Sequence, residues 1–374
     1  SYNTLSVERD ASGAPTGASL LPLYEMLEGQ VAAISSHTVA PEQAERTLES
    51  VRSSALYRED QHSYMLYPNR ELPGFMERNV VPAQKAGESP AVRKLLAAPD
   101  QTLVVADVAG AVHFDPDFRN AGILRRAARD YLKAHPDSAL TDGDIEELAE
   151  LYEETFQHQY FTGRSGTFFG YEGLGSIYWH MVSKLLLATQ ENVVRAHRAG
   201  DDDLARTLRE RYFDIRRGIG FNKKPAEYGA FPMDPYSHTP WGAGAKQPGM
   251  TGQVKEEIIA RFAELGLLVN AGRIEFDPFL VRDDEFASEP LVLTWVDPAG
   301  AERSLDVEPG SFAYTFCQTP IVASRGGSDA HLVVHRRDGG EQRIDSLTCP
   351  AEVSREVFDK SGAVERIDVV FAGA

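Results

Sequence analysis

Several features that narrow the function of a protein are scarce in this 374-residue chain. It has two cysteines, Cys317 and Cys349, which are too few for a disulfide framework and lack the spacing of zinc ligands. No run approaches the ~18 consecutive apolar residues of a membrane-spanning helix. Acidic residues outnumber basic ones, and the net charge of −18 argues against binding to nucleic acid or anionic membranes. The two cysteines form either one bridge or two buried thiols, and we favour the thiols.

The sequence motifs of several common active sites are also missing. The chain contains no P-loop, no H-E-x-x-H zinc motif, no G-x-S-x-G elbow and no context for a cysteine nucleophile. No secretory signal pattern is present, so we expect a cytoplasmic protein. Because the chain begins at Ser1, we expect a processed protein or the C-terminal portion of a longer one.

Apolar periodicity predicts a helical first part. Thr141-x-x-Asp144 is a capping pattern, and Pro41 and Asp201 stand at favoured helix starts. Residues 102–107 and 111–114 suit a small hairpin, whereas residues 1–18 are predicted to be coil and 56–79 irregular. The predicted helices cover residues 20–35, 41–54, 90–97, 119–134, 141–159, 176–199, 202–217 and 251–265.

From Leu267 onward the pattern changes to short alternating apolar runs separated by Gly, Pro, Asp and Asn. This pattern is typical of an antiparallel sheet or sandwich. We therefore predict an α+β, multi-domain fold, with an α-helical toroid or bundle followed by an antiparallel β-sandwich. The predicted parts are a mixed segment over 1–115, a toroid-like domain over 116–266 with a long aromatic loop at 218–250, and the sandwich over 267–374.

The loop from Gly218 to Gly249 is the most informative stretch. It lacks periodicity yet is rich in aromatics, whereas disordered segments are poor in them. Aromatic faces beside polar donors suit sugar recognition, so Tyr236, His238 and Trp241 are predicted to bind substrate. The alternative is a surface loop whose aromatics form their own small core.

A second stretch, residues 161–180, is rich in glycine and leads into a predicted helix. Such a loop lets backbone N–H groups approach an anion at the helix N-terminus. Arg164 is a candidate phosphate ligand, Tyr171 a sugar-stacking ring and Glu172 a local acid. The alternative is a tight turn between helices.

Two further candidates lie on helices. His180 and Lys184 are four residues apart, on one face of a largely apolar helix, where two polar residues favour a cavity over a core histidine. Thr251 is predicted to be an N-cap that holds an anion, or to be only a cap. The cluster at Tyr57–His62 and the acidic helical face at 146–154 are interpreted as solvated charges.

The C-terminal ~200 residues resemble the cellobiose and chitobiose phosphorylases, the inverting family often called glycoside hydrolase family 94. The resemblance rests on residues 175–180 with the apolar helix that follows, on Thr251-Gly252, and on residues 272–278. It implies a toroid followed by a β-sandwich, with His180 and Thr251 binding inorganic phosphate. The family's D-W-N-D acid segment is missing, and the first ~150 residues do not match the family. Residues 222–253 also resemble a bacterial family of long, carbohydrate-enzyme-like proteins.

We therefore expect a glycoside phosphorylase or an inverting glycoside hydrolase. No cofactor and no metal are expected, and inorganic phosphate is the expected co-substrate. The expected ligand is an oligosaccharide, with no nucleic acid and no membrane, and an upstream domain of the same protein or a second copy is a further partner. The alternative function is a non-catalytic carbohydrate-binding or structural module. The predicted roles are Glu172 as the acid, Tyr171, Tyr236, Trp241 and His238 for sugar, and His180, Thr251, Arg164 and Lys184 for phosphate.

Overall fold

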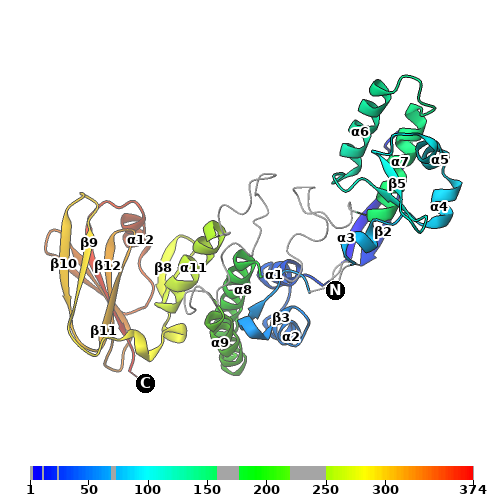
Figure 1. Ribbon diagram of the computed structural model, residues 1–374. Coiled ribbons are helices and arrows are strands. Elements are labelled where there is room, and N and C mark those ends of the chain that lie inside the picture. The colour runs from blue at the N-terminus through cyan, green and yellow to red at the C-terminus, as the bar shows by residue number, and fades with distance from the viewer. Residues whose placement is uncertain are drawn as a thin grey trace. The chain divides into compact units, whose positions relative to one another are not determined.

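The structure is a computed structural model that describes residues 3–10, 12–22, 25–68, 73–157, 177–219 and 250–373. Contacts between Cα atoms divide the chain into two units, Ser1–Leu185 with Phe213–Gln253 and Leu186–Tyr212 with Val254–Ala374. Helices and strands occur in both (Figure 1), so the predicted α+β class is confirmed. The described residues do not show a toroid. No helix among them is long and apolar enough to cross a bilayer.

A hairpin forms where the sequence analysis predicted coil. Strands β1 (Asn3–Arg9) and β2 (Pro15–Pro22) pair antiparallel. The carboxylate of Asp10 closes the turn by accepting a hydrogen bond of 3.0 Å from the Ala14 N–H, and Gly13 supplies the φ of +85°. Because β2 extends to Pro22, the next helix begins at Leu27, later than predicted.

Two helices and a short hairpin follow in the first unit. Pro41 occupies the first turn of the second helix, as predicted. The hairpin holds the residues interpreted as a solvated cluster. These elements are α1 (Leu27–Ser35), α2 (Pro41–Arg52), β3 (Tyr57–Arg58), the 3-10 turn η1 (Glu59–Gln61) and β4 (Ser63–Tyr64).

Residues 73–157 form a compact helical stretch with a hydrophobic core of their own. The predicted hairpin and the predicted helices of this stretch are confirmed, whereas α3 and α4 were not predicted. Buried residues of that core come from the four longer helices and the hairpin. The elements are α3 (Phe75–Arg78), α4 (Ala83–Glu88), α5 (Pro90–Ala97), β5 (Val104–Ala106), β6 (Val112–Phe114), α6 (Ala121–Ala134) and α7 (Asp142–Phe156).

The hairpin is fixed to this core by hydrogen bonds from buried polar groups. The Asn79 amide donates to the Phe114 carbonyl at 2.8 Å and accepts from the Phe114 N–H at 3.0 Å. The ring of Phe114 meets Tyr152 of α7 edge-on, with 5.2 Å between centroids. The Tyr152 hydroxyl donates to the Phe118 carbonyl at 2.6 Å. Each buried polar group thus has a partner, as burial requires.

The predicted capping box at Thr141 and Asp144 is confirmed. Asp144 is 6% exposed, and Lys94 of α5 donates to its carboxylate at 2.7 and 2.9 Å. Burial raises the pKa of Asp144, but the hydrogen bonds from Lys94 and Thr141 outweigh this effect, so the pKa lies below its usual value. The carboxylate therefore joins the start of α7 to α5 in its ionised form.

Replacing Asp144 by Asn is expected to lower the free energy of unfolding by about 1–3 kcal/mol, because hydrogen bonds to a buried charge are lost. The folded state binds the Asp144 proton more weakly than the unfolded state. The stabilisation is therefore complete above the ordinary pKa of 3.8 and is lost as the pH falls through the lowered pKa. Chemical denaturation of both proteins at several pH values checks this, and a difference that grows in acid contradicts it.

The next helices match their predictions closely. Helix α8 carries buried apolar residues on most of its faces, and the Asp201 carboxylate caps α9 by accepting from the Leu204 N–H at 3.1 Å. Helix α11 precedes the C-terminal strands, and two 3-10 turns lie between the second and the third of these strands. The bounds are α8 (Trp179–Arg198), α9 (Asp202–Arg217), α11 (Met250–Glu264), η4 (Pro278–Leu280) and η5 (Asp283–Glu285).

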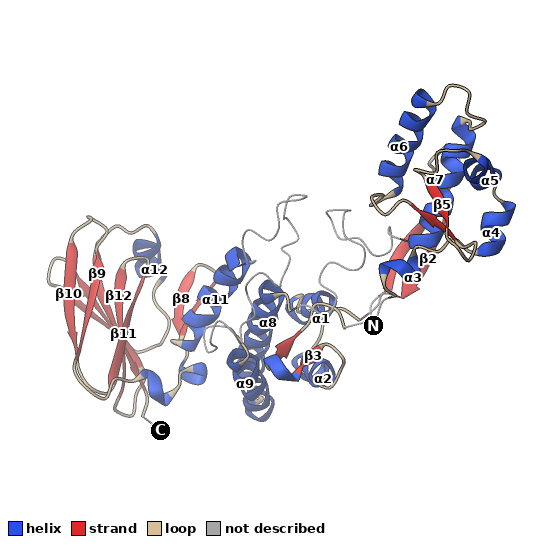
Figure 2. Ribbon diagram, viewed as in Figure 1, coloured by secondary structure: helices blue, strands red, loops and turns tan. Residues whose placement is uncertain are grey.

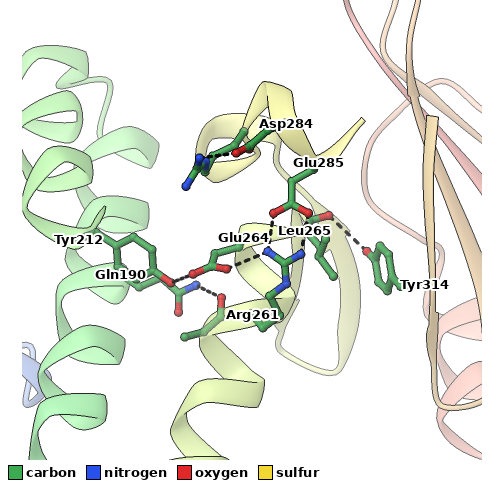
Figure 3. A network of polar contacts seen from close by, with 10 residues as sticks. Gln190, Tyr212, Arg261, Glu264, Leu265, Asp284, Glu285 and Tyr314 are labelled. Carbon is green, nitrogen blue, oxygen red and sulfur yellow. Dashed lines mark hydrogen bonds and ion pairs between the residues drawn. The ribbon is translucent and has the colours of Figure 1, made fainter. Parts of the chain in front are cut away.

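A buried carboxylate holds α9, α11 and η5 together in the second unit (Figure 3). Glu264 is 5% exposed and accepts from the Tyr212 hydroxyl at 2.6 Å and from Arg261 at 2.9 Å. The guanidinium of Arg261 also donates to both oxygens of Glu285, at 2.5 and 2.6 Å. These contacts, first of all those with Glu285, raise the pKa of Arg261. Gln190 donates a further hydrogen bond of 3.0 Å to the Ala260 carbonyl of α11. The hydrogen bonds from Tyr212 and Arg261 compensate the cost of burying the charge of Glu264.

The C-terminal strands occur where the alternating runs predicted them, and Figure 2 shows them beside a helix that was not predicted. Five form one sheet in the order β11-β12-β15-β13-β14, and the rest pair as β7–β8 and β9–β10. The strands and helix are β7 (Leu267–Asn270), β8 (Arg273–Phe276), β9 (Leu291–Val296), β10 (Glu302–Val307), β11 (Ser311–Phe316), β12 (Thr319–Arg325), β13 (His331–Arg336), β14 (Glu341–Ile344), α12 (Ala351–Phe358) and β15 (Val364–Phe371).

One pairing departs from the predicted antiparallel arrangement. Strand β15 inserts between β12 and β13 and runs antiparallel to β13 but parallel to β12. Its alternate residues Ile367, Val369 and Phe371 are buried, as the period of two requires. Val353 and Val357 of α12 are buried in the same core. Helix α12 thus connects β14, at the edge of the sheet, to β15 in its middle.

The two cysteines are free thiols, as favoured from the sequence. Burial raises the pKa of Cys349 to about 12 and also raises that of the half-buried Cys317. A thiol in this state is a poor nucleophile. The cysteines are therefore packing residues.

Candidate active site

Most of the predicted site residues lie outside the described residues. This group contains Arg164, Tyr171, Glu172, Tyr236, His238 and Trp241. Thr251 is the second residue of α11 and not its N-cap, because the helix begins at Met250. His180 and Lys184 are the predicted residues whose side chains are described.

His180 and Lys184 are both half-buried and lie one turn apart near the start of α8. Their neighbours Met181, Val182 and Leu185 are buried. The ring of Tyr178 meets the imidazole of His180 edge-on, with 5.8 Å between centroids. The predicted shared face of a largely apolar helix is therefore confirmed.

A polar cluster in the same unit joins residues that are far apart in the sequence. The imidazole of His62, between η1 and β4, has Nδ1 3.0 Å from the Tyr57 hydroxyl. Its Nε2 lies 3.1 Å from Oδ1 of Asp214 on α9 and 3.2 Å from the Asp214 carbonyl oxygen. His62 itself has a φ of +46°, a left-handed conformation that is uncommon outside glycine. The backbone thus adopts an unfavourable conformation at the residue that links the hairpin to α9.

Two guanidinium groups surround the same carboxylate. Arg217 donates to Asp214 at 2.7 Å, and Arg52 of α2 lies 3.4 Å from its other oxygen. The Arg52 guanidinium also sits 3.4 Å from the ring centroid of Tyr57, a cation–π contact. Burial raises the pKa of Asp214, but the Arg217 hydrogen bond and the charges of His62, Arg217 and Arg52 outweigh this and lower it. Asp214 is therefore ionised at neutral pH.

An ionised Asp214 determines the hydrogen-bonding roles of His62. Nε2 carries a hydrogen and donates to the carboxylate, which leaves Nδ1 to accept from the Tyr57 hydroxyl. Burial raises the pKa of Tyr57, so the hydroxyl keeps its proton. The side chain of His62 is 38% exposed. Arg52, Arg217 and Asp214 together leave one positive charge at this cluster.

The two segments singled out in the sequence attach to the described structure beside this cluster. Ile177, near the end of the glycine-rich stretch, forms a backbone bridge with Met65. Gly218, where the aromatic loop begins, lies so close to the hairpin that a Cβ there would be 1.9 Å from the His62 carbonyl oxygen. His62 and Met65 thus lie against an end of each segment.

The sequence analysis missed this cluster. For Arg58 and Asp60 the interpretation as solvated charges is confirmed, because they pair with each other at 2.8 Å and Asp60 is 61% exposed. Tyr57 and His62 are instead only partly exposed, and His62 contacts both Tyr57 and Asp214 of α9. No local pattern points to Asp214, which lies 152 residues beyond His62.

The comparisons with known proteins give one match. Residues 72–159 match the family described as GH149 phosphorylase insertion domain 2. The matched range corresponds to the stretch with its own hydrophobic core. No curated protein matches the chain. A relationship to glycoside phosphorylases is therefore supported.

The position of this match corrects the sequence analysis. The resemblance was placed in the C-terminal ~200 residues, and the first ~150 were thought unrelated, whereas the supported relationship lies within the first half of the chain. The candidate residues His62, His180 and Asp214 all lie outside the matched range. The matched description names an insertion domain of a phosphorylase.

Replacing Gly218 by Ala is expected to lower the free energy of unfolding by about 1–3 kcal/mol, because the hairpin backbone must move to admit the methyl group. Gly143→Ala in α7 is the control, since a Cβ there would be an ordinary 3.6 Å from the Thr141 hydroxyl. Chemical denaturation measures both. Equal stability of the two variants contradicts the crowding at Gly218.

Proposed function

We propose that this chain acts in the phosphorolysis of an oligosaccharide, as a glycoside phosphorylase or as part of one. The observation that carries the proposal is the match of residues 72–159 to a phosphorylase insertion domain. An insertion domain accompanies the enzyme into which it is inserted. The catalytic residues are therefore expected outside residues 72–159.

In the reaction, a phosphate oxygen attacks the anomeric carbon from the face opposite the glycosidic bond. The C–O bond to the leaving sugar breaks, and an acid gives its proton to the leaving oxygen. The products are a sugar 1-phosphate and a shortened sugar. Glu172 is proposed as the acid, with Tyr171, Tyr236, His238 and Trp241 in contact with sugar.

The phosphate nucleophile requires donors and positive charge. His180, Thr251, Arg164 and Lys184 are proposed to supply them, on the basis of the sequence resemblance. The His62 cluster supports the presence of an anion in the same unit, because Arg52 and Arg217 exceed the charge of Asp214. Guanidinium groups suit phosphate, since they donate paired hydrogen bonds.

A second candidate function is a non-catalytic carbohydrate-binding or structural module of a larger enzyme. The description of the matched family as an insertion domain favours it, and so does the missing D-W-N-D segment. In this case the acid belongs to another part of the assembly. Glu172 then has no catalytic role.

Incubation of the full chain with β-linked gluco-oligosaccharides, with and without phosphate, separates these functions. Sugar 1-phosphate formed only with phosphate supports the phosphorylase. Reducing ends formed without phosphate indicate hydrolysis instead. Binding without either product supports the module, and no binding at all contradicts both.

For the phosphorylase, Glu172→Gln is expected to lower kcat by about 10²–10⁴-fold, because proton transfer to the leaving oxygen is lost. His180→Ala is expected to raise the KM for phosphate by about 10- to 100-fold, since a hydrogen bond to a charged group is worth about 1.5–3 kcal/mol. His331→Ala on β13 is the control. A KM for phosphate that is the same in both histidine variants excludes His180 from phosphate binding.

The role of the His62 cluster has its own test. Arg217→Gln removes one of two guanidinium groups beside Asp214, so the KM for phosphate is expected to rise several-fold. Arg206→Gln is the matched control, because Arg206 lies on the same helix and pairs with Asp203 three residues away, as Arg217 pairs with Asp214. If both variants behave alike, Arg217 acts only in helix stability.

A further inference from the structure

A polar depression of about 530 Å³ lies beside the β9–β10 ribbon of the second unit. Figure 1 shows this ribbon next to β11 and β12. The volume falls in the range of small-molecule sites. None of its lining residues was a candidate from the sequence. Those that matter here are Trp295, Arg303, Gln318, His335, Arg337 and Arg366.

Asp297 fixes one side of this depression. Its side chain is 7% exposed and accepts from the backbone N–H groups of Ala299 and Ala301, both at 2.9 Å. The same carboxylate accepts from Nε of Arg303 at 2.9 Å and lies 3.6 Å from a terminal nitrogen of Arg337. The two guanidinium groups remain 53% and 57% exposed. A buried anchor thus holds two exposed groups of donors in place.

A second carboxylate orders the other side. Asp368 accepts from Nε2 of His335 at 2.7 Å and from a terminal nitrogen of Arg366 at 3.0 Å. Glu341 lies 3.1 Å from the other imidazole nitrogen of His335. The Gln318 amide donates to the Val296 carbonyl at 3.1 Å, which leaves its oxygen as an acceptor. Donors and acceptors are therefore both present around the depression.

Carboxylates outnumber guanidinium groups at this surface. Arg303 and Arg337 share Asp297, Arg366 has Asp368, Glu341 faces His335, and Glu365 also lines the depression. No surplus positive charge is left to attract phosphate or another anion. Groups that are already paired and ordered bind a neutral, hydrogen-bonding ligand without a large entropic cost.

Trp295 supplies an apolar surface within this polar surround. It is half-buried on β9 and pairs in register with Arg303 of β10. The two residues also border a second depression of about 500 Å³, together with Thr294 and Glu302. An indole face among fixed polar groups is suited to the C–H face of a sugar.

We propose that this surface, which contains none of the residues proposed for catalysis, binds a neutral oligosaccharide. It holds the oligosaccharide through stacking on Trp295 and through hydrogen bonds with Arg303, Arg337 and Gln318. The inference goes beyond the proposed function, because it requires no cleavage. It predicts that longer oligosaccharides bind more tightly than disaccharides.

The test is isothermal titration calorimetry of the full chain with cellopentaose and with laminaripentaose. Trp295→Ala is expected to weaken the binding of at least one of them by about tenfold or more. Leu291→Ala is the matched control, because Leu291 is an apolar residue of the same strand, is 55% exposed and does not line either depression. Arg303→Lys is a second variant, which keeps the charge and loses the fork of donors.

Glu172→Gln and His180→Ala are expected to leave the Trp295-dependent binding unchanged, and Trp295→Ala to leave the turnover of a disaccharide unchanged. Failure of the proposed catalysis is thereby distinguished from failure of this site. Binding of neither pentaose, or equal binding by Trp295→Ala and Leu291→Ala, overturns the proposal. Competition by inorganic phosphate for the Trp295-dependent binding also overturns it, since the site is then an anion site.

Discussion

The polar arrangement around His62 in the first unit depends on the carboxylate of Asp214. It meets Arg52 from α2, His62 from the short hairpin and Arg217 from its own helix. Without it, two guanidinium groups and an imidazole face one another with no negative charge between them. The close approach of Gly218 to the His62 carbonyl belongs to the same arrangement, because only a residue without a side chain lets α9 end against the hairpin.

The stretch with the phosphorylase match is built differently. Its buried residues form one cluster, its three longest helices carry their own side-chain caps, and the Lys94–Asp144 pair joins α5 to the start of α7. The candidate catalytic residues lie outside it. The comparison thus links the chain to glycoside phosphorylases through residues 72–159. This stretch contains none of the residues proposed for the reaction.

Local signals in the sequence were sufficient for much of the fold. Pro90 and the apolar spacing after it define α5, Thr141 and Asp144 define the start of α7, and turn residues separate the C-terminal strands. The N-terminal hairpin was missed, because its strands carry few of the large apolar residues that mark buried strands. The parallel pairing of β12 with β15 was missed for another reason: strand order is set by contacts between distant segments.

The same distinction applies to the candidate site. His180 and Lys184 share a helix face, as their spacing predicted, since that relation is local. The partnership of His62 with Asp214 and the grouping around Trp295 join residues that no periodicity connects. The remaining site predictions from the sequence concern residues outside the described parts and stay predictions.

The backbone bridge between Met65 and Ile177 has a consequence for how such a chain is assembled. It fastens together two points that are separated by more than a hundred positions, and the matched stretch at 72–159 lies wholly between them. The chain therefore runs into and out of this stretch from two adjacent positions, Met65 and Ile177. A stretch such as 72–159 can be gained, lost or exchanged with little loop-closure cost, because the Met65–Ile177 bridge that holds its two ends together lies outside it.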